Sequence, residues 1–118
     1  MPNVFKLKSH AAMPVAGASN ELELLYTCPS STTTIVLGLI LCNVHTSQVN
    51  ASIKLESTTN DTEVNQPVML LNNVPIPAGS SLELLSGGKV VLKVGDKLYI
   101  KSSTDATLDA ALSIMEST

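Results

Sequence analysis

The residues that could carry out chemistry in this chain are two cysteines and two histidines, Cys28, Cys42, His10 and His45. These are ligand types that zinc prefers, and Cys42-x-x-His45 could supply two of the four ligands of a structural site. The other two would have to come from Cys28 and the N-terminal His10, in a spacing unlike the familiar paired patterns. We therefore expect no metal and no cofactor, and interpret both cysteines as small buried apolar residues. A Cys28–Cys42 disulfide stays an open alternative.

Catalytic motifs are missing from the rest of the chain. Nucleophilic catalysis needs a nucleophile, a base and an orienting group, and no Gly-x-Ser-x-Gly sequence is present. The glycine-rich Ser86-Gly87-Gly88-Lys89 lacks the rest of a phosphate-binding loop and does not open a helix. Sugar sites use aromatic platforms, but the chain has one Phe, two Tyr and no Trp. The sequence therefore predicts no enzyme, and a host-glycan-binding module is kept only as the weaker alternative.

Composition limits the partners. The 118 residues suffice for one domain with its own core. Only 14% of them are charged, the net charge is −3, and all seven basic residues are Lys. Without Arg or a basic surface we expect no nucleic-acid partner. The longest apolar run, residues 35–42, is too short to span a membrane, and the N-terminus lacks a signal-peptide pattern, so we expect no membrane partner either.

Hydrophobic residues recur with the period of two that is typical of β-strands. Val49, Ala51, Ile53 and Leu55 alternate with polar residues, as in a strand with one buried face. The run at 33–44 is almost wholly apolar, which fits either a strand covered on both faces or one whose outer face meets another subunit. The other expected strands lie at residues 21–26, 68–71, 82–85, 90–94, 98–100 and 108–115. About eight short strands predict an all-β fold, a single antiparallel β-sandwich of jelly-roll type.

Turn chemistry predicts how these strands are connected. Pro75 and Pro77 remove ladder donors, so residues 75–80 are interpreted as a connection. Residues 86–89 predict a tight hairpin turn between the strands at 82–85 and 90–94, and Gly95-Asp96 predicts another turn. Lysines at 93, 97 and 101 are typical of edge strands that avoid aggregation.

The N-terminal segment differs from the rest and is predicted to be an extended arm. We divide the chain into an arm at residues 1–20 and a β-sandwich domain at residues 21–118. A chain without catalytic or metal-binding motifs is typical of a structural component of an assembly. An arm of this kind can be ordered by a neighbouring subunit. The expected assembly contacts are Val4, Phe5 and Leu7 in the arm, with Thr58 and Ser103 in loops at the rim. We expect self-association as a dimer or trimer.

Several segments between residues 20 and 116 also resemble a known family. They are Leu25–Pro29, Ser31–Leu39, Asn43–Ser47, Val74–Leu84, Lys89–Leu92, Gly95-Asp96 and Leu108–Ser113. In this order they resemble small virion structural proteins of tailed bacteriophages, especially phages of cyanobacteria and other aquatic bacteria. Cys28 stands where an aliphatic residue is expected, which favours a buried thiol.

The resemblance implies a non-enzymatic β-sandwich on the phage particle, made in the cytoplasm of the bacterial host. Its first functional expectation is a capsid decoration or cement protein that contacts its own copies and the major capsid protein. The alternative is a neck, baseplate or tail-fibre component in contact with tail or neck proteins.

Overall fold

The computed structural model describes residues 3–13, 22–57, 59–60, 62–85, 89–104 and 106–118. Within these residues the regular elements are all strands, and no helix that could cross a membrane is found. The strands are β1 (Asn3–Met13), β2 (Glu23–Thr27), β3 (Thr33–Asn43), β4 (Val49–Glu56), β5 (Val68–Ile76), β6 (Ser81–Leu84), β7 (Val90–Leu92), β8 (Lys97–Ser102) and β9 (Leu108–Ser117).

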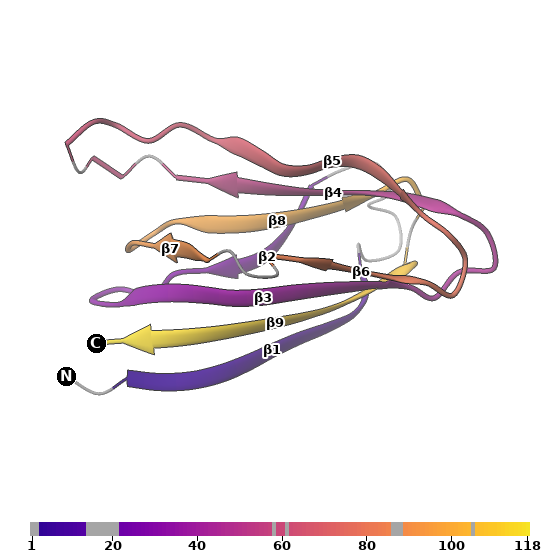
Figure 1. The fold of residues 1–118 in the computed structure, drawn as a ribbon. Coiled ribbons are helices and arrows are strands. Elements are labelled where there is room, and N and C mark those ends of the chain that lie inside the picture. The colour runs from indigo at the N-terminus through magenta and orange to yellow at the C-terminus, as the bar shows by residue number, and fades with distance from the viewer. Residues whose placement is uncertain (1–2, 14–21, 58, 61, 86–88, 105) are drawn as a thin grey trace.

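The strands form two antiparallel sheets that lie face to face (Figure 1). One has the order β1-β9-β3-β6, with β7 also paired to β3, and the other has the order β2-β8-β4-β5. Strands that follow one another in the chain therefore mostly lie in different sheets, as in a double-sheet jelly roll. The predicted all-β fold, a single antiparallel sandwich of jelly-roll type, is confirmed.

The core between the sheets is aliphatic because each strand buries alternate side chains. In β9, Leu108, Ala110, Leu112 and Ile114 point inward, while the residues between them lie on the outer side. β4 and β8 place Ile53 and Ile100, both fully buried, opposite one another. Burying each large aliphatic side chain stabilises the fold by about 1.5–3 kcal/mol before the entropy of ordering is counted.

The predicted hairpin at residues 86–89 is wrong. β6 and β7 both pair antiparallel with β3, β6 along residues 39–42 and β7 along residues 34–36. Two segments antiparallel to the same strand run in the same direction, so β6 and β7 lie in line on one edge of the sheet. They act as one interrupted strand. The structure has nine strands where about eight were expected, because residues 3–13 of the expected arm form β1.

The expected connection at residues 75–80 is wrong at its start, because β5 continues through Pro75 to Ile76. β5 is the last strand of its sheet and pairs only with β4 among the described strands. A proline can therefore stand there without removing a hydrogen bond to a second neighbour. The expected edge position is wrong for Lys97 and Lys101, since β8 lies between β2 and β4. Lys93 directly follows β7, which pairs only with β3 among the described strands.

Residues 3–13 of the N-terminal segment are extended as expected, and the structure adds where they lie. β1 pairs along its length with β9, from Asn3 opposite Ser117 to Met13 opposite Leu108, with a bulge after His10. The start of β1 and the end of β9 therefore lie side by side (Figure 1). The division of the chain at residue 20 stays a prediction.

Asn43 holds the loops together at the far end of β3. Its side chain is fully buried and donates to the carbonyl oxygens of Ser47 at 3.0 Å and Ile76 at 2.9 Å. Its Oδ1 accepts from the His45 amide at 2.8 Å. The loop after β3 thus depends on a buried amide whose hydrogen bonds are satisfied.

Candidate assembly surface

The outer side of the β1-β9-β3-β7 sheet carries a row of apolar side chains. The register places Phe5 opposite Met115, Met115 opposite Ile35, and Ile35 opposite Val91. Side chains directly opposite one another share a face of the sheet. Phe5 is 71% exposed and Val91 is 54% exposed. One cross-strand row therefore presents four apolar side chains to the outside.

Further apolar residues continue this surface along the strands. Leu7 is 66% exposed and Ile40 is 46% exposed, and the register puts Ile40 opposite Ala111. Leu37, at the bulge of β3, lies beside a hollow of about 320 Å³ that Gly38 and Ser113 also line. We define the apolar face as the outward side chains Phe5, Leu7, Ile35, Leu37, Ile40, Val91, Ala111 and Met115.

The apolar face has few charges, whereas the outer side of the second sheet has many. Asp109 and Glu83 are the carboxylates among the outward residues of β9 and β6, and Asp109 accepts a hydrogen bond from the Ala12 amide at 2.9 Å. On the second sheet the outward side chains of β4 and β8 include Lys54, Glu56, Lys97, Tyr99 and Lys101, with an ion pair between Lys54 and Glu56 at 3.6 Å. Leu24 and Met69 lie on the same outer side and are 47% and 44% exposed. The two outer surfaces therefore differ mainly in the number of charges they carry.

The apolar face is large enough for a specific contact. A strand of 11 residues in a sheet four strands wide covers roughly 700 Å². A standard protein interface buries about 800 Å² on each partner. Contact over most of this face would therefore suffice for a stable association.

The structure places the predicted contact residues at different sites. Phe5 and Leu7 lie on the apolar face, but Val4 is opposite Glu116 and so lies on the inward side of β1. Ser103 is exposed at the other end of the sandwich, where it exchanges hydrogen bonds of 3.0 Å with the backbone of Asn50. Thr58 lies outside the described residues. Whether any of them contacts a partner stays a prediction.

Sequence reasoning missed the other members of the apolar face, above all Ile40 and Met115. Its only signal was the unbroken apolar run of β3, which left open whether the outer side meets other strands or another subunit. In the structure the inward residues of β3 are fully covered, whereas Ile35, Leu37 and Ile40 on the outer side are not. The outer side of β3 is therefore not covered by the described residues of the chain, and contact with another subunit stays a prediction.

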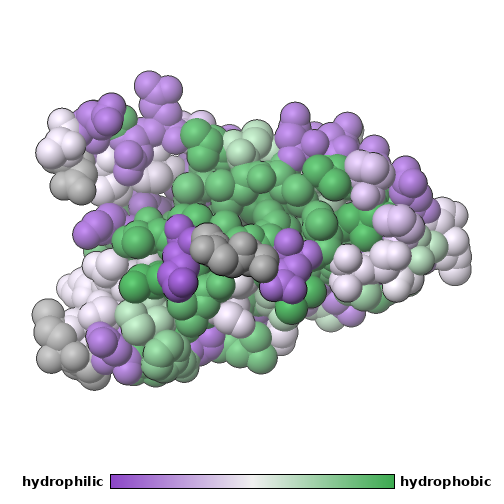
Figure 2. Space-filling model, in the orientation of Figure 1, coloured by the Kyte–Doolittle hydropathy of each residue, from purple (hydrophilic) through white to green (hydrophobic). Residues whose placement is uncertain are grey.

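The open side of the sandwich, between β5 and the β6–β7 edge, is also apolar (Figure 2). A hollow of about 430 Å³ lies there, and Val91 of the apolar face lines it together with Val68 and Leu55. Its polar lining comes from Glu63, Asn65 and other side chains, and no aromatic residue is among the described residues that line it. It therefore lacks the stacking platform of a sugar site.

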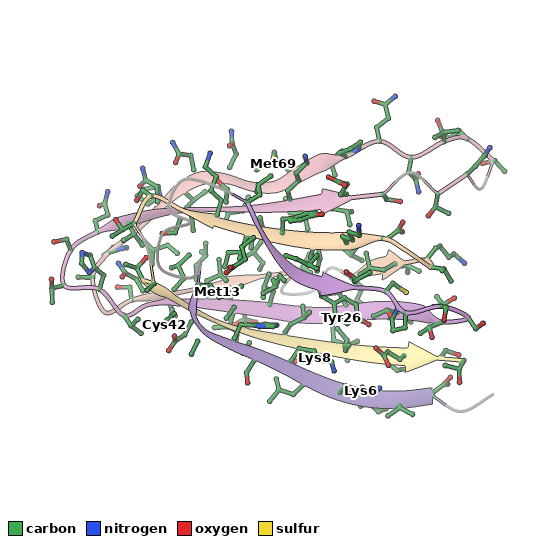
Figure 3. The ribbon with its side chains drawn as sticks, turned by 180° about the vertical axis from the view of Figure 1, so that it is seen from behind. Lys6, Lys8, Met13, Tyr26, Cys42 and Met69 are labelled. Atoms are coloured by element: carbon green, nitrogen blue, oxygen red, sulfur yellow. The ribbon has the colours of Figure 1, made fainter. Side chains whose placement is uncertain are left out.

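A polar network crosses the interior near the chain ends. Glu116 on β9 is 7% exposed and receives hydrogen bonds from Lys6 Nζ at 2.7 Å and from the Tyr26 hydroxyl at 2.6 Å. Tyr26 also lies 3.0 Å from Thr34 Oγ1, which is 3.4 Å from Cys28 Sγ. Figure 3 shows Lys6 and Tyr26 at the same end of the sandwich. The network links β1, β9 and β3 to β2 of the other sheet.

The pKa values of this network are shifted in the directions that its contacts require. The hydrogen bond from Lys6 lowers the pKa of Glu116 below its ordinary value of 4.5, and the bond from Tyr26 lowers it further, against the opposing effect of burial. Burial raises the pKa of Tyr26, and so does its bond to the Glu116 carboxylate. Glu116 is therefore held as an anion and Tyr26 as a neutral donor.

The residues first considered for chemistry do not form a site. Cys28 is buried beside Thr34, whereas Cys42 is eight residues further along β3, about 26 Å away. Both are free thiols, so the Cys28–Cys42 disulfide is ruled out. Burial confirms the interpretation of Cys28 but not fully that of Cys42, which is half-buried. In the described part of the chain no three His, Cys, Asp or Glu side chains converge on a common point.

Comparison with known proteins identifies the fold. Neither a protein-family model nor a curated protein matches the sequence. A chain of the T13 particle of infectious bursal disease virus matches with a TM-score of 0.55 and 9% identity, covering 97% of this chain and 30% of the viral one. VP2 of the subviral particle of the same virus matches with a TM-score of 0.55 and 8% identity, covering 97% and 32%. Our chain spans about a third of these viral chains and shares the fold of that part.

Proposed function

We propose that this protein is a non-enzymatic structural protein of a virus particle. Its task is to occupy a position in a shell by contact with copies of itself and with neighbouring coat proteins. The observation that carries the proposal is the difference between the two outer sheet surfaces. One is apolar with few charges and has room for a full interface, and the other carries several charged side chains beside its exposed Leu24 and Met69. The fold shared with chains of a virus particle supports it.

The physical reason lies in the cost of burying each surface. Covering the apolar face stabilises the contact by about 1.5–3 kcal/mol for each large side chain that becomes fully buried. Few charges have to be desolvated in the process. Covering the second sheet would bury lysines and glutamates, which costs free energy unless each is paired. The apolar face is therefore the contact side and the charged sheet the solvent side.

Within this class we propose a capsid decoration or cement protein of a tailed bacteriophage, located on the virion. The resemblance of the sequence segments supports the phage particle. An apolar face on every copy suits repeated contacts with other copies, as a dimer or trimer, and with a major capsid protein. Many weak contacts on one lattice add up through effective concentration.

Two substitutions of matched exposure test the contact. Ile40 on the apolar face is 46% exposed and Met69 on the second sheet is 44% exposed. We expect Ile40→Lys to weaken self-association at least tenfold in sedimentation velocity, because a lysine buried in the contact loses its hydration. Met69→Lys should associate like the parent protein, and both variants should keep the parent's unfolding midpoint.

Equal association of the two variants would overturn the proposed contact face. A second assay adds each variant to phage particles stripped of this protein and measures the heat resistance of the particles. Restoration by Met69→Lys but not by Ile40→Lys is expected for a cement protein. Failure of the parent protein to restore resistance, with copies imaged only on the tail, would reject the decoration role in favour of a tail component.

A further inference from the structure

β1 contributes less to the core than any other long strand. Of its 11 residues only Met13, the last one, is buried. The residues that alternate with the exposed Phe5 and Leu7 on its inward side include Lys6, Lys8 and His10, which are polar (Figure 3). β9, its neighbour, supplies four buried apolar side chains. The apolar packing of the sandwich is therefore nearly complete without β1.

β1 is held in the sheet mainly by hydrogen bonds along β9 and by one ion pair. The ladder runs from Asn3 opposite Ser117 to His10 opposite Ala110 without a break. Lys6 adds its 2.7 Å contact to Glu116. Every one of these contacts is made to β9, or to a side chain on β9, so another copy of β1 laid on the same edge would make all of them again.

We propose that β1 is exchanged between copies of this chain, so that β1 of one copy pairs with β9 of its neighbour. The inference rests on the proposed self-association, which brings copies together. It adds that the β9 edge of each copy pairs with β1 of another copy. In an exchanged pair the contacts of each β1 are the same as in the closed chain, and only the connection to β2 differs. Exchange of an identical element is a low-cost route to an assembly.

The connection is long enough for the exchange. Eight residues, 14–21, join the end of β1 to the start of the described part before β2. Eight residues can span at most about 28 Å when extended. The two short dimensions of the molecule are 27 and 26 Å. The connection can therefore cross one molecular width and reach the edge of an adjacent copy.

A disulfide between β1 and β9 tests the exchange. His10 and Ala110 are opposite one another on the inward side of β1 and β9. Their Cα atoms, as an antiparallel pair, are about 4.5–5.5 Å apart, within the range of a disulfide. Two single variants, His10→Cys and Ala110→Cys, are made with Cys42→Ser in both. They are mixed as folded proteins, incubated and oxidised with oxidised glutathione.

Exchange predicts a disulfide-linked heterodimer of twice the 12.4 kDa chain mass, joined between positions 10 and 110. Glu116→Gln in both chains should increase its rate of formation several-fold, because the Lys6 ion pair is lost. Glu56→Gln, which removes an ion-paired carboxylate on the second sheet, should leave the rate unchanged. The chain carrying both cysteines, oxidised when dilute, is the control that shows the geometry is correct, and it should form an internal disulfide.

The outcomes separate the two proposals. Association in sedimentation without any heterodimer, while the double-cysteine chain closes its own disulfide, overturns the exchange and leaves the proposed function standing. Heterodimer formation that is equally fast with Ile40→Lys in both chains supports the exchange and counts against the apolar face as the contact. No rate increase with Glu116→Gln overturns the role of the Lys6–Glu116 pair as the latch of β1.

Discussion

Glu116 is the residue where the two sheets and the N-terminal strand are tied together. Its carboxylate accepts from Lys6 on β1 and from Tyr26 on β2, while its own strand forms the centre of the sheet between β1 and β3. Lys6 is 42% exposed, so solvent screens the ion pair. The hydrogen bond from the buried Tyr26 is therefore the larger contribution to stability, and the ion pair mainly positions β1.

Replacing this carboxylate should make the protein less stable in a pH-dependent way. The pKa of Glu116 is lower in the folded than in the unfolded chain, so its contribution is fully present above its ordinary value of 4.5 and is lost as the pH falls through the folded pKa. We expect Glu116→Gln to lower the free energy of unfolding by about 1–2 kcal/mol at pH 7. The difference from the parent should shrink below pH 4.5.

Urea unfolding at pH 7, 5, 4 and 3 measures this difference. Glu83→Gln is the matched control, because Glu83 is exposed, and it should stay within about 0.5 kcal/mol of the parent at each pH. A difference between Glu116→Gln and the parent that stays constant down to pH 3 would show that the charge of Glu116 does not stabilise the fold.

At the scale of elements, the turn after β7 depends on a positive φ angle, which glycine adopts without strain. Gly95 has a φ of +86°, and the Asp96 amide donates to the Lys93 carbonyl oxygen at 3.0 Å across the turn. Gly38, in contrast, lies in β3 with open space where a Cβ would be placed and without a positive φ. The two glycines therefore have different reasons to be there.

Alanine at these two positions should have opposite effects. We expect Gly95→Ala to lower the free energy of unfolding by about 1–2 kcal/mol, because an L-residue is strained at positive φ. Gly38→Ala should leave it unchanged or raise it by up to about 1 kcal/mol, because the unfolded chain loses freedom and no clash arises. Thermal and urea unfolding of both variants measures the effect. A larger loss for Gly38→Ala would contradict the described geometry of β3.

The strands that could be predicted from the sequence are those whose alternation is unbroken. β4 was predicted with its observed bounds, Val49–Glu56, because apolar and polar residues alternate throughout. The strand expected at residues 21–26 has Leu22, Leu24 and Tyr26 in alternation with Glu21, Glu23 and Leu25. The register of β2 shifts between Leu24 and Tyr26, so Leu25 and Tyr26 are both buried and Leu24 is 47% exposed. A bulge adds a residue to one strand without a signal in residue type, so periodicity cannot locate it.

Pairing between distant segments was equally hidden from the sequence. Glycines at 87 and 88 favour a hairpin locally, but β6 and β7 each gain a longer partner in β3. The apolar face could be predicted only in part for the same reason. Phe5 and Leu7 were identified by residue type, whereas Ile35 and Met115 become neighbours only through the β3–β9 register.

At the scale of the whole molecule, the sandwich measures 45 × 27 × 26 Å and has two broad outer surfaces, one for each sheet. One broad side is the apolar face, and the opposite broad side carries the lysines of β4 and β8. A copy that joins a shell keeps its charged side chains in water only if the apolar face is turned toward the contact. We therefore expect all copies on a particle to present the charged sheet to solvent.

The free thiol of Cys42 allows the central claim, that copies meet through the apolar face, to be tested without any substitution. Cys42 is half-buried and lies on the outer side of β3, where the register places it opposite Asp109 (Figure 3). Cys28 is buried and serves as the internal control. The measurement is the rate of Cys42 alkylation by a maleimide at increasing protein concentration, with association followed in the same samples by light scattering. We predict that the rate falls several-fold as copies associate, while Cys28 stays unreactive throughout. An unchanged rate in fully associated protein would contradict the account, because copies would then meet through a different surface.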